Sequence, residues 1–397
     1  MKNPKLQALL AVALTFAALW CLLAWDPFRH LRDVFVDPAQ EEAKISLLFT
    51  DPNTQEVSDG QHPLESLRKL ESNWCNVTKE ARYILTGNSQ TFSVLLAPSE
   101  AVATEEADRT YPDLLLDRLT AAGAKVHGYR LSAPNISYME VLWYLNYLLV
   151  HPCLIPGEFV IQLNFETFRK TGVREGMFEL LEDPDFASAI KQEARSNAPY
   201  ANTLQQAIDQ YASRIAKEKG TQTSSISKTG ITEARGFGSV FETTTRIALD
   251  HLSWLRSRGQ LKAQLLDFLY LARVNLLGIT PTTKRSLGGG PLTTNLSSLE
   301  RIGELCRRNG IRLVFFNAPQ NPNAPLYRTT ADREQYQQII SGLARQFAQG
   351  YFDFENSIPG PLWGVWIDGP DPIHFGRAAH RRLADLMFEQ GMISGEK

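Results

Sequence analysis

Short apolar runs alternate along the chain with longer segments in which apolar residues recur at helical spacing. An apolar run that ends at a turn is typical of a buried strand, whereas apolar positions three or four residues apart predict a helix. The predicted strands are RYILTG (82–87), KVHGYRLS (125–132), EFVIQLN (158–164), IRLVFFNA (311–318) and GYFDF (350–354). The predicted helices cover 111–123, 138–150, 298–310 and about 375–387. This alternation predicts an α/β fold with a mostly parallel central sheet.

Two other segments depart from this alternation. Residues 26–80 are polar and mixed, which predicts a stalk or linker before a domain that spans 81–390. Within that domain, residues 170–295 form a long insertion in which the pattern predicts mainly helices, one of them over 203–217. A second, over 261–278, is rich in Leu and aromatic residues and could dock on a membrane. Burial within its own domain is the favoured interpretation, because amphipathic helices usually bury their apolar face there.

The N-terminus carries a membrane-length apolar run. Residues 6–25 are twenty uncharged residues that follow a short tip, 1–5, containing Lys2 and Lys5. Twenty helical residues span roughly 30 Å, the thickness of a bilayer core, and preceding lysines favour a cytoplasmic N-terminus. We therefore expect a single-pass anchor with the rest of the chain outside the cytoplasm, in a periplasm or its equivalent. A cleaved signal peptide is the alternative, although its apolar region should be shorter and end at small residues, whereas Trp25 is bulky.

Composition excludes several classes of function. The formal net charge is −2, so the sequence lacks the excess of Lys and Arg that is typical of a protein that binds nucleic acid. The four cysteines show no C-x-x-C or Cys/His spacing, so we predict neither a metal site nor a cofactor. In an oxidising compartment Cys75 and Cys153 are the obvious candidates for a disulfide, although the sequence does not establish that they are close.

Polar residues follow the predicted strands at the edge where a parallel sheet gathers its active site. They are Ser89, Asn135, Asn164, Asp371 and His374. A serine nucleophile, a histidine that takes its proton, an aspartate that orients the histidine and amide donors for an oxyanion are the parts of an acyl-transfer site.

Each of these residues also has a structural interpretation. Ser89 alone is more often a helix cap, because serine is a preferred N-cap. Asp371 before Pro372 has the pattern of an N-cap with proline at the first helical position, and Asn164 could simply satisfy a strand end. Asp368 is a rival to Asp371 as the residue that orients His374. Taken together the candidates favour an assembled site, because the roles and their order along the chain agree.

Three stretches resemble the sequence blocks of the SGNH (GDSL-like) hydrolases and acyltransferases, over about residues 82–390. Gly87-Asn88-Ser89 resembles the nucleophile turn, QLNF (162–165) the block that supplies an oxyanion-hole asparagine, and DPIH (371–374) the Asp-x-x-His block. The resemblance implies a flavodoxin-like three-layer fold. It also implies a Ser89–His374–Asp371 triad and an oxyanion hole formed by Ser89 N–H, Asn164 and Asn135.

The resemblance is imperfect. Asn88 stands where Asp is commonest, and Asn135 stands nearest the place where the family offers a glycine N–H. Gln162 and Phe165 replace the usual Gly and Asp around Asn164.

Other histidines and tryptophans are weaker candidates. His380 is expected to be a surface residue, and His127 and His151 receive no role. Trp363 and Trp366, just before the Asp-x-x-His block, could form a wall for a sugar ring or pack in the core.

An anchored domain of this type with a large insertion resembles the envelope-modifying members of the family, such as those that transfer D-alanine to teichoic acids or acetylate alginate. The resemblance implies transfer of an acyl group from an ester donor to a glycan acceptor on the cell surface, beside a multipass membrane O-acyltransferase. Two alternatives remain open: an anchored esterase or deacetylase with the same triad, and a degenerate domain that serves as a scaffold or glycan-binding subunit.

Overall fold

A seven-stranded sheet lies at the centre of the part of the chain that the structure describes. The structure is a computed structural model, and the residues it describes are 48–50, 57–58, 63–91, 109–133, 136–226, 286–324, 328–366 and 369–394. All of them belong to one unit of the chain, made of Ile45–Gly230 and Leu269–Lys397. The predicted tip (1–5) and anchor (6–25) lie outside the described residues.

Five strands of the sheet are parallel and match the predicted ones to within two residues at each end. They are β3 (Arg82–Gly87), β4 (His127–Ser132), β5 (Glu158–Leu163), β6 (Arg312–Asn317) and β7 (Gly350–Asp353). Their spatial order is β4-β3-β5-β6-β7, which is the flavodoxin-like order of a doubly wound sheet. Two short strands, β1 (Leu48–Thr50) and β2 (Val57–Ser58), extend the β4 edge, and β1 runs antiparallel to β4. The prediction of a mostly parallel sheet is confirmed.

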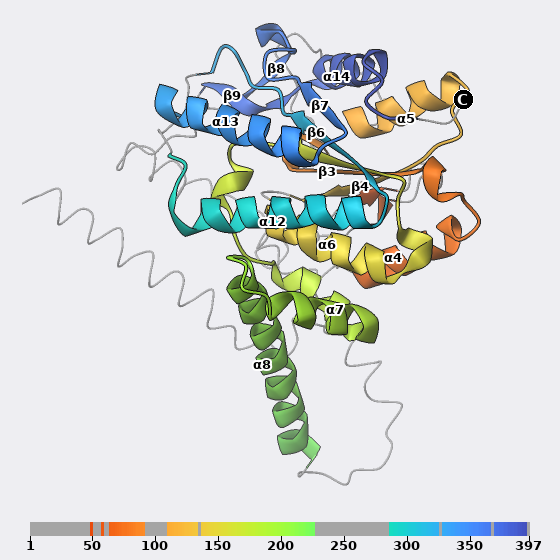
Figure 1. The fold of residues 1–397 in the computed structure, drawn as a ribbon, viewed down its shortest axis with the longest axis vertical. Coiled ribbons are helices and arrows are strands. Elements are labelled where there is room, and N and C mark those ends of the chain that lie inside the picture. Colours follow the sequence, from red (N-terminus) through yellow and green to blue (C-terminus); the bar gives the residue numbers. More distant parts are fainter. Residues whose placement is uncertain are drawn as a thin grey trace, which may run out of the picture. The chain divides into compact units, whose positions relative to one another are not determined.

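Successive residues of each parallel strand enter two different cores, because side chains alternate across a sheet. In β3, Ile84 packs in one core while Tyr83 and Leu85 pack in the other. The Ile84 side includes helices α4 (Pro63–Trp74), α6 (Tyr138–Val150), α12 (Gly289–Arg308) and α13 (Thr330–Phe347). The opposite side includes α5 (Tyr111–Ala121) and α14 (Arg377–Glu389). The result is three layers, with the sheet between two sets of helices (Figure 1).

The helix before β6 and the last helix start at residues other than the predicted ones. The helix before β6 begins at Gly289, nine residues before the predicted start at Ser298. The last helix begins at Arg377, because Gly369–Phe375 forms strand β9 of a separate two-stranded sheet with β8 (Trp363–Trp366). The interpretation of Asp371 as a helix N-cap is therefore wrong.

Part of the polar segment before the domain packs on the domain itself. Residues 63–74 form α4, which buries Leu64, Leu67, Leu70 and Trp74 against the domain core. These four apolar positions recur at helical spacing within an otherwise polar stretch, so composition alone conceals the amphipathic helix. The stalk prediction does not hold for this part of 26–80.

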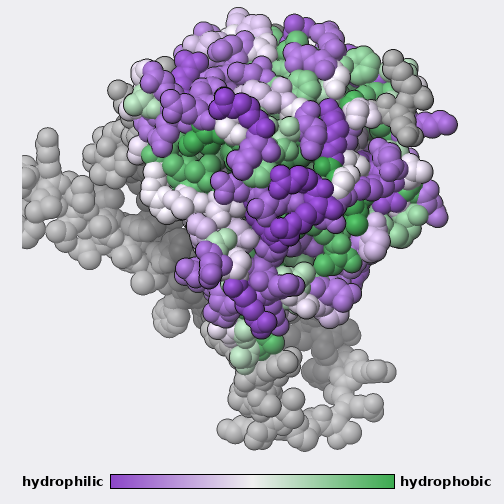
Figure 2. All heavy atoms as spheres, in the orientation of Figure 1, coloured by the Kyte–Doolittle hydropathy of each residue, from purple (hydrophilic) through white to green (hydrophobic). Residues whose placement is uncertain are grey.

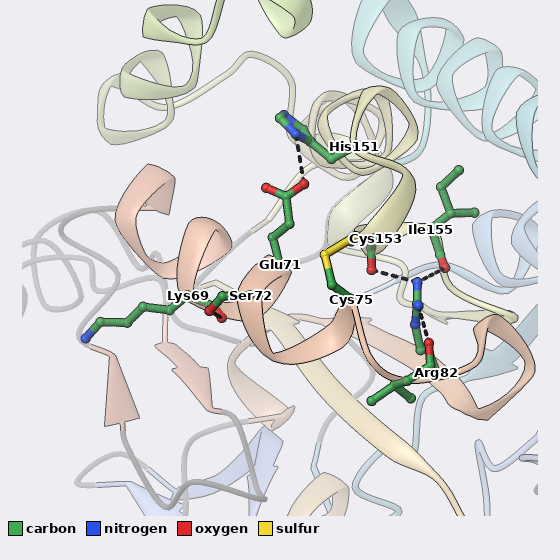
Figure 3. The surroundings of a disulfide bond; sticks show 9 residues. Lys69, Glu71, Ser72, Cys75, Arg82, His151, Cys153 and Ile155 are labelled. Carbon is green, nitrogen blue, oxygen red and sulfur yellow. Dashed lines mark hydrogen bonds and ion pairs between the residues drawn. A yellow bond between two sulfur atoms is a disulfide. The ribbon is translucent and has the colours of Figure 1, made fainter.

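A disulfide fastens the end of α4 to the domain. Cys75 and Cys153 are bonded, joining α4 to the short turn η3 (Pro152–Leu154) after α6 (Figure 3). The Arg82 guanidinium donates to Cys153 O at 2.6 Å and also to the backbone oxygen of Val77, so it ties the segments that flank the two cysteines to β3. Beside them, His151 Nδ1 lies 3.4 Å from Glu71 Oε1.

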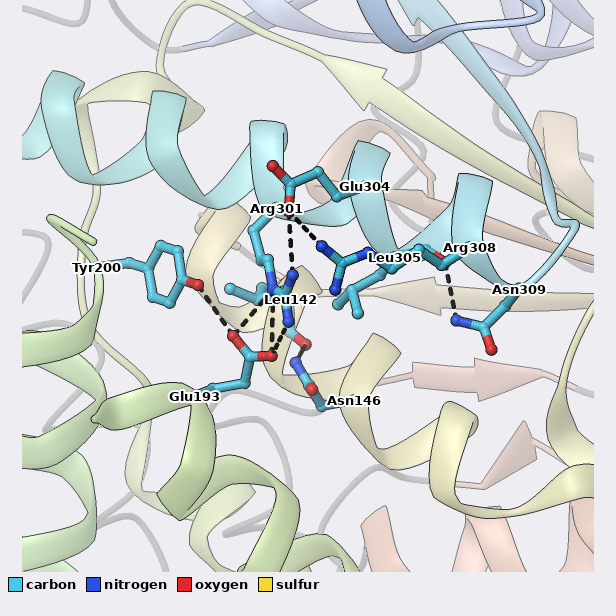
Figure 4. A network of polar contacts seen from close by, with 9 residues as sticks. All are labelled: Leu142, Asn146, Glu193, Tyr200, Arg301, Glu304, Leu305, Arg308 and Asn309. Atoms are coloured by element: carbon cyan, nitrogen blue, oxygen red, sulfur yellow. Dashed lines mark hydrogen bonds and ion pairs between the residues drawn. The ribbon is translucent and has the colours of Figure 1, made fainter. Parts of the chain in front are cut away.

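The described part of the insertion is helical, as predicted. It contains η5 (Glu175–Glu182), α7 (Pro184–Ala194) and α8 (Ala201–Ile226), the last covering the predicted helix 203–217 and continuing beyond it. Glu193 of α7 accepts hydrogen bonds from Arg301 of α12 and from the Tyr200 hydroxyl, which joins the insertion to the domain (Figure 4). The helix predicted over 261–278 lies outside the described residues.

One face of the molecule can be compared with the prediction of a membrane contact. The face seen in Figure 2 carries mostly hydrophilic residues with small hydrophobic areas between them. Among the residues that the structure describes, none of the helices combines the length and apolar character needed to cross a bilayer.

Candidate active site

The nucleophile turn follows directly from the central strand β3. Gly87 ends the strand, Asn88 is buried, and Ser89–Thr91 form a short 3-10 turn. Asn88 caps this turn: its Oδ1 accepts from Gln90 N at 3.0 Å, and its backbone oxygen accepts from Thr91 N at 3.0 Å. Because Asn88 performs the capping, the hydroxyl of Ser89 is left to make another bond. The interpretation of Ser89 as the cap is therefore wrong.

The Ser89 hydroxyl instead meets a histidine from the far end of the sequence. Ser89 Oγ lies 2.8 Å from His374 Nε2, and His374 Nδ1 lies 3.0 Å from Asp371 Oδ2. With Nδ1–H donating to the carboxylate, Nε2 is the acceptor for the Ser89 proton, which is the tautomer that a general base needs. The structure thus brings together all three residues proposed for the triad.

Asp371 is held by its own loop. Its Oδ1 accepts from Ile373 N at 2.6 Å and from His374 N at 2.7 Å, while Oδ2 faces the imidazole. The Asp371 side chain is 4% exposed and that of His374 is 20% exposed. Asn321 adds a bond from its Nδ2 to Asp371 O at 2.7 Å. The two backbone N–H donors fix the direction of the carboxylate, and the carboxylate therefore fixes the direction of the imidazole.

Asn164 lies at the same sheet edge as Ser89. The parallel pairing of Thr86 with Ile161 places Ser89 and Asn164 each three residues beyond matched positions of β3 and β5. These strands flank the point where the strand order reverses, which is where ligands bind in doubly wound sheets.

The orientation of Asn164 is fixed on two sides. Its backbone N–H donates to the Tyr138 hydroxyl at 3.1 Å, and its Oδ1 accepts from Glu166 N at 2.8 Å. Burial raises the pKa of Tyr138, so the phenol stays protonated and can donate to the Gln162 backbone oxygen, 3.4 Å away. With Oδ1 engaged, the NH₂ group of the Asn164 amide is the donor available to a ligand oxygen.

Three candidates from the sequence cannot be placed, and a fourth packs in the core. Asn135 and the rival aspartate, Asp368, lie outside the described residues, as does the side chain of Trp366. Trp363 is buried, packs edge-on against Phe375 with ring centroids 5.2 Å apart and donates to Ile358 O, so the core-packing interpretation is confirmed for it.

His380 is not the surface residue that was predicted. It is fully buried, its Nδ1 accepts from Tyr111 N at 3.2 Å, and its ring stacks on that of Tyr111. The prediction failed because α14 packs directly on α5, so this face of the last helix has no access to solvent.

Four residues around the site were missed by sequence reasoning. They are Gln90, Tyr138, Gln162 and Asn321, each of which bonds to the backbone or side chain of a candidate site residue or its neighbour. Only Gln162 had a signal, as a departure from the family pattern.

One pocket of the described residues lies away from the triad. It has a volume of about 430 Å³ and is lined by residues of α7 and α12, including Glu193 and Arg301, and by none of the triad residues. Across the described ranges, no cluster of three His, Cys, Asp or Glu side chains is arranged to hold a metal ion.

No protein-family model matches the chain, and no curated protein matches it either. Among solved structures, the native aryl esterase of M. smegmatis is similar at 14% identity, with 78% of this chain and 97% of that chain covered and a TM-score of 0.31. Its inhibitor-bound form is similar at 13% identity over the same shares, with a TM-score of 0.30. At these TM-scores the likeness supports no conclusion about activity, so the proposed function rests on the geometry of the site.

Proposed function

We propose that this protein is a serine-dependent enzyme of the SGNH type that cleaves an acyl ester through an acyl-Ser89 intermediate. One observation carries the proposal: Ser89, His374 and Asp371 form a continuous hydrogen-bonded chain at the carboxyl edge of a parallel sheet, with distances of 2.8 and 3.0 Å. A degenerate scaffold would not need an imidazole held in the correct tautomer and aimed at a serine hydroxyl.

In the first half-reaction, Ser89 Oγ attacks the acyl carbonyl carbon while His374 Nε2 takes the hydroxyl proton. The oxyanion that forms accepts hydrogen bonds from Ser89 N–H and the Asn164 NH₂ group. Cleavage of the bond between the carbonyl carbon and the leaving oxygen then releases the alcohol, which receives the proton from His374. Asp371 remains ionised throughout and stabilises the imidazolium.

In the second half-reaction, an acceptor hydroxyl resolves the acyl-serine. His374 takes the proton of the acceptor hydroxyl while the acceptor oxygen attacks the acyl carbon. The bond between the acyl carbon and Ser89 Oγ then breaks, and His374 returns the proton to Ser89. With water as acceptor the product is a carboxylic acid, and the enzyme is an esterase. With a glycan hydroxyl the product is a new ester, and the enzyme is an O-acyltransferase.

The finer proposal is transfer to a cell-envelope or exported polysaccharide. It is supported by the uncharged run 6–25, which would anchor the chain with its catalytic domain outside the cytoplasm. The Cys75–Cys153 disulfide also supports an oxidising compartment such as the periplasm. An ester donor delivered through a multipass membrane O-acyltransferase would fit this placement. No cofactor is required by the proposed chemistry.

Product analysis with p-nitrophenyl acetate as donor tests the proposal. We expect turnover by the wild type, its loss in Ser89→Ala and its retention in Ser72→Ala, an exposed serine on α4. A set of envelope polysaccharides added as acceptors should yield acetylated glycan if the enzyme is a transferase. Acetate as the sole product would assign it as an esterase, and absence of turnover by folded wild type would reject the enzymatic proposal.

A further inference from the structure

Two buried glutamines lie directly behind the candidate triad. Gln90 follows the proposed nucleophile in the 3-10 turn, and Gln162 comes near the end of β5, two residues before Asn164. The exposed fractions are 1% for Gln90 and 3% for Gln162. Burying an amide is costly unless its polar atoms find partners, so the partners of these two side chains indicate why they are there.

The two amides form a continuous relay. Gln162 Oε1 accepts from Asn88 N at 2.9 Å, and Gln162 Nε2 donates to Gln90 Oε1 at 2.7 Å. Gln90 Nε2 then donates to Ile373 O at 2.6 Å and to Pro319 O at 3.1 Å. One end of the relay is the residue before Ser89, and the other is the residue between Asp371 and His374.

The direction of both amides is fixed by the groups at the two ends. Of the two ends of the Gln90 amide, only the NH₂ group can donate to the carbonyl oxygens of Ile373 and Pro319. Oε1 of Gln90 therefore faces Gln162. The backbone N–H of Asn88 needs a hydrogen-bond acceptor, so Oε1 of the Gln162 amide faces Asn88. Neither an ionised carboxylate nor an apolar side chain can supply both the donor and the acceptor that each position needs.

The hydrogen-bonded pair of glutamines connects the turn that carries Ser89 to the loop that carries His374, which the two sheets do not connect. Ser89 follows β3 of the main sheet, whereas Asp371 and His374 belong to β9, which pairs with β8 in a separate two-stranded sheet. No ladder of backbone hydrogen bonds between the described strands therefore sets the distance from Ser89 to His374. Side-chain bonds set it instead, because Gln90 reaches Ile373 and Asn321 reaches Asp371.

The backbone makes room for the relay. A Cβ on Gly87 would lie 2.6 Å from Gln162 Oε1 and 2.1 Å from Thr91 Cγ2, so only glycine fits beneath the Gln162 amide. The departure from the family pattern at residue 162 thus has a physical role in this chain.

We infer that Gln90 and Gln162 are positioning residues that hold Ser89 within hydrogen-bond range of His374. The inference rests on the proposed function, because it assigns these residues to the same acyl-transfer site. Neither residue touches the reacting atoms; Gln90 acts through the loop that carries His374, and Gln162 acts through Gln90 and the Asn88 N–H. A displacement of about 1 Å in such a pair costs on the order of 100-fold in rate, so loss of the relay should be visible in kcat.

The test compares Gln90→Met, Gln162→Met and the double variant, using p-nitrophenyl acetate as substrate. Methionine preserves length and volume but cannot bridge these partners. Each single variant should lower kcat by about 10- to 100-fold with KM within about twofold of the wild type. The double variant should be no slower than the slower single variant, because both break the same relay. Asn146→Leu removes another buried amide, which bonds to Leu142 O within α6, and should leave kcat unchanged.

Gln90→Glu provides a readout that a purely structural role would not change. When protonated, the introduced carboxyl group can donate to the Ile373 oxygen, whereas its ionised form repels that oxygen. The ratio of the rate of this variant to the wild-type rate should therefore rise as the pH falls. If Gln90→Met does not fold, Gln90→Glu and Gln162→Met still test the positioning role.

The two proposals fail in different ways. Wild-type kcat in folded Gln90→Met and Gln162→Met, with turnover still abolished in Ser89→Ala, would overturn the positioning role and leave the proposed function intact. A pH-independent ratio of Gln90→Glu to wild-type rates would also overturn the positioning role. Absence of turnover by the folded wild type would instead overturn the proposed function and this inference with it.

Discussion

Removing the Cys75–Cys153 disulfide is expected to destabilise the protein substantially. The bond closes a loop with a sequence separation of 78 residues and joins α4 to the turn after α6. Replacing both cysteines with serine avoids leaving a reactive thiol. The nearby bonds from Arg82 go to backbone oxygens, including Cys153 O, so they do not depend on the sulfur atoms.

The magnitude follows from the entropy of the unfolded chain. For a loop of 78 residues, the loop-closure relation gives about 15 cal/mol/K, or about 4.5 kcal/mol at 25 °C. Typical domains have a free energy of unfolding of about 5–15 kcal/mol, so losing the disulfide would remove a large part of the stability of the protein.

Urea unfolding of Cys75→Ser/Cys153→Ser, compared with the wild type, measures this loss. We expect a decrease of about 3–5 kcal/mol in the free energy of unfolding and a larger denaturant slope, because the uncrosslinked chain exposes more surface. The wild type in reducing agent should behave like the double variant. A decrease below about 1 kcal/mol in both experiments would refute the explanation based on the unfolded state.

Three further predictions follow from individual contacts. Asp371→Asn should lower kcat by about 10⁴-fold with an unchanged circular dichroism spectrum, because the amide cannot enforce the required His374 tautomer; retained kcat would contradict this. Asn164→Asp keeps the Oδ acceptor for Glu166 N but lacks the NH₂ donor, and should lower kcat by at least about 100-fold with little effect on KM. A loss confined to KM would assign Asn164 to substrate binding instead. Burial raises the pKa of Tyr200 to about 12, so its stabilising contribution is present below pH 10 and lost as the pH rises through 12. The difference in unfolding free energy between wild type and Tyr200→Phe should narrow over this range, and a constant difference in urea titrations would contradict the assignment.

The sheet was predictable because its strands are buried on both faces. Every residue of β3 and of β5 is buried, and the middle of each strand, YIL (83–85) and FVI (159–161), is an uninterrupted apolar or aromatic run that stands out in the sequence. The polar residues that follow such strands are conspicuous for the same reason, which is how Ser89 and Asn164 were found. His374 and Asp371 were found from their spacing, although β9, the strand that carries them, was not among the predicted strands.

The residues that were missed act through contacts between distant parts of the chain. Gln90 meets Ile373 across 283 positions of sequence, and no periodic pattern records such a contact. Asn88, not Ser89, proved to be the cap, because two neighbouring residues can both cap a turn and only the fold decides between them. His380 was misplaced for a related reason: whether one face of a helix is buried depends on the helix that packs against it, here α5.

Covalent labelling with a serine-reactive fluorophosphonate, followed by peptide mapping, tests the central claim most directly. The reagent should modify Ser89, because His374 draws the proton from its hydroxyl and the oxyanion donors bind the phosphonyl oxygen. Labelling should disappear in Ser89→Ala and fall sharply in His374→Ala, while Ser72→Ala is labelled like the wild type. An adduct at Ser89 that depends on His374 is the result we predict. Folded wild type that stays unlabelled, or an adduct on another residue that survives Ser89→Ala, would contradict the assignment of Ser89 as the nucleophile.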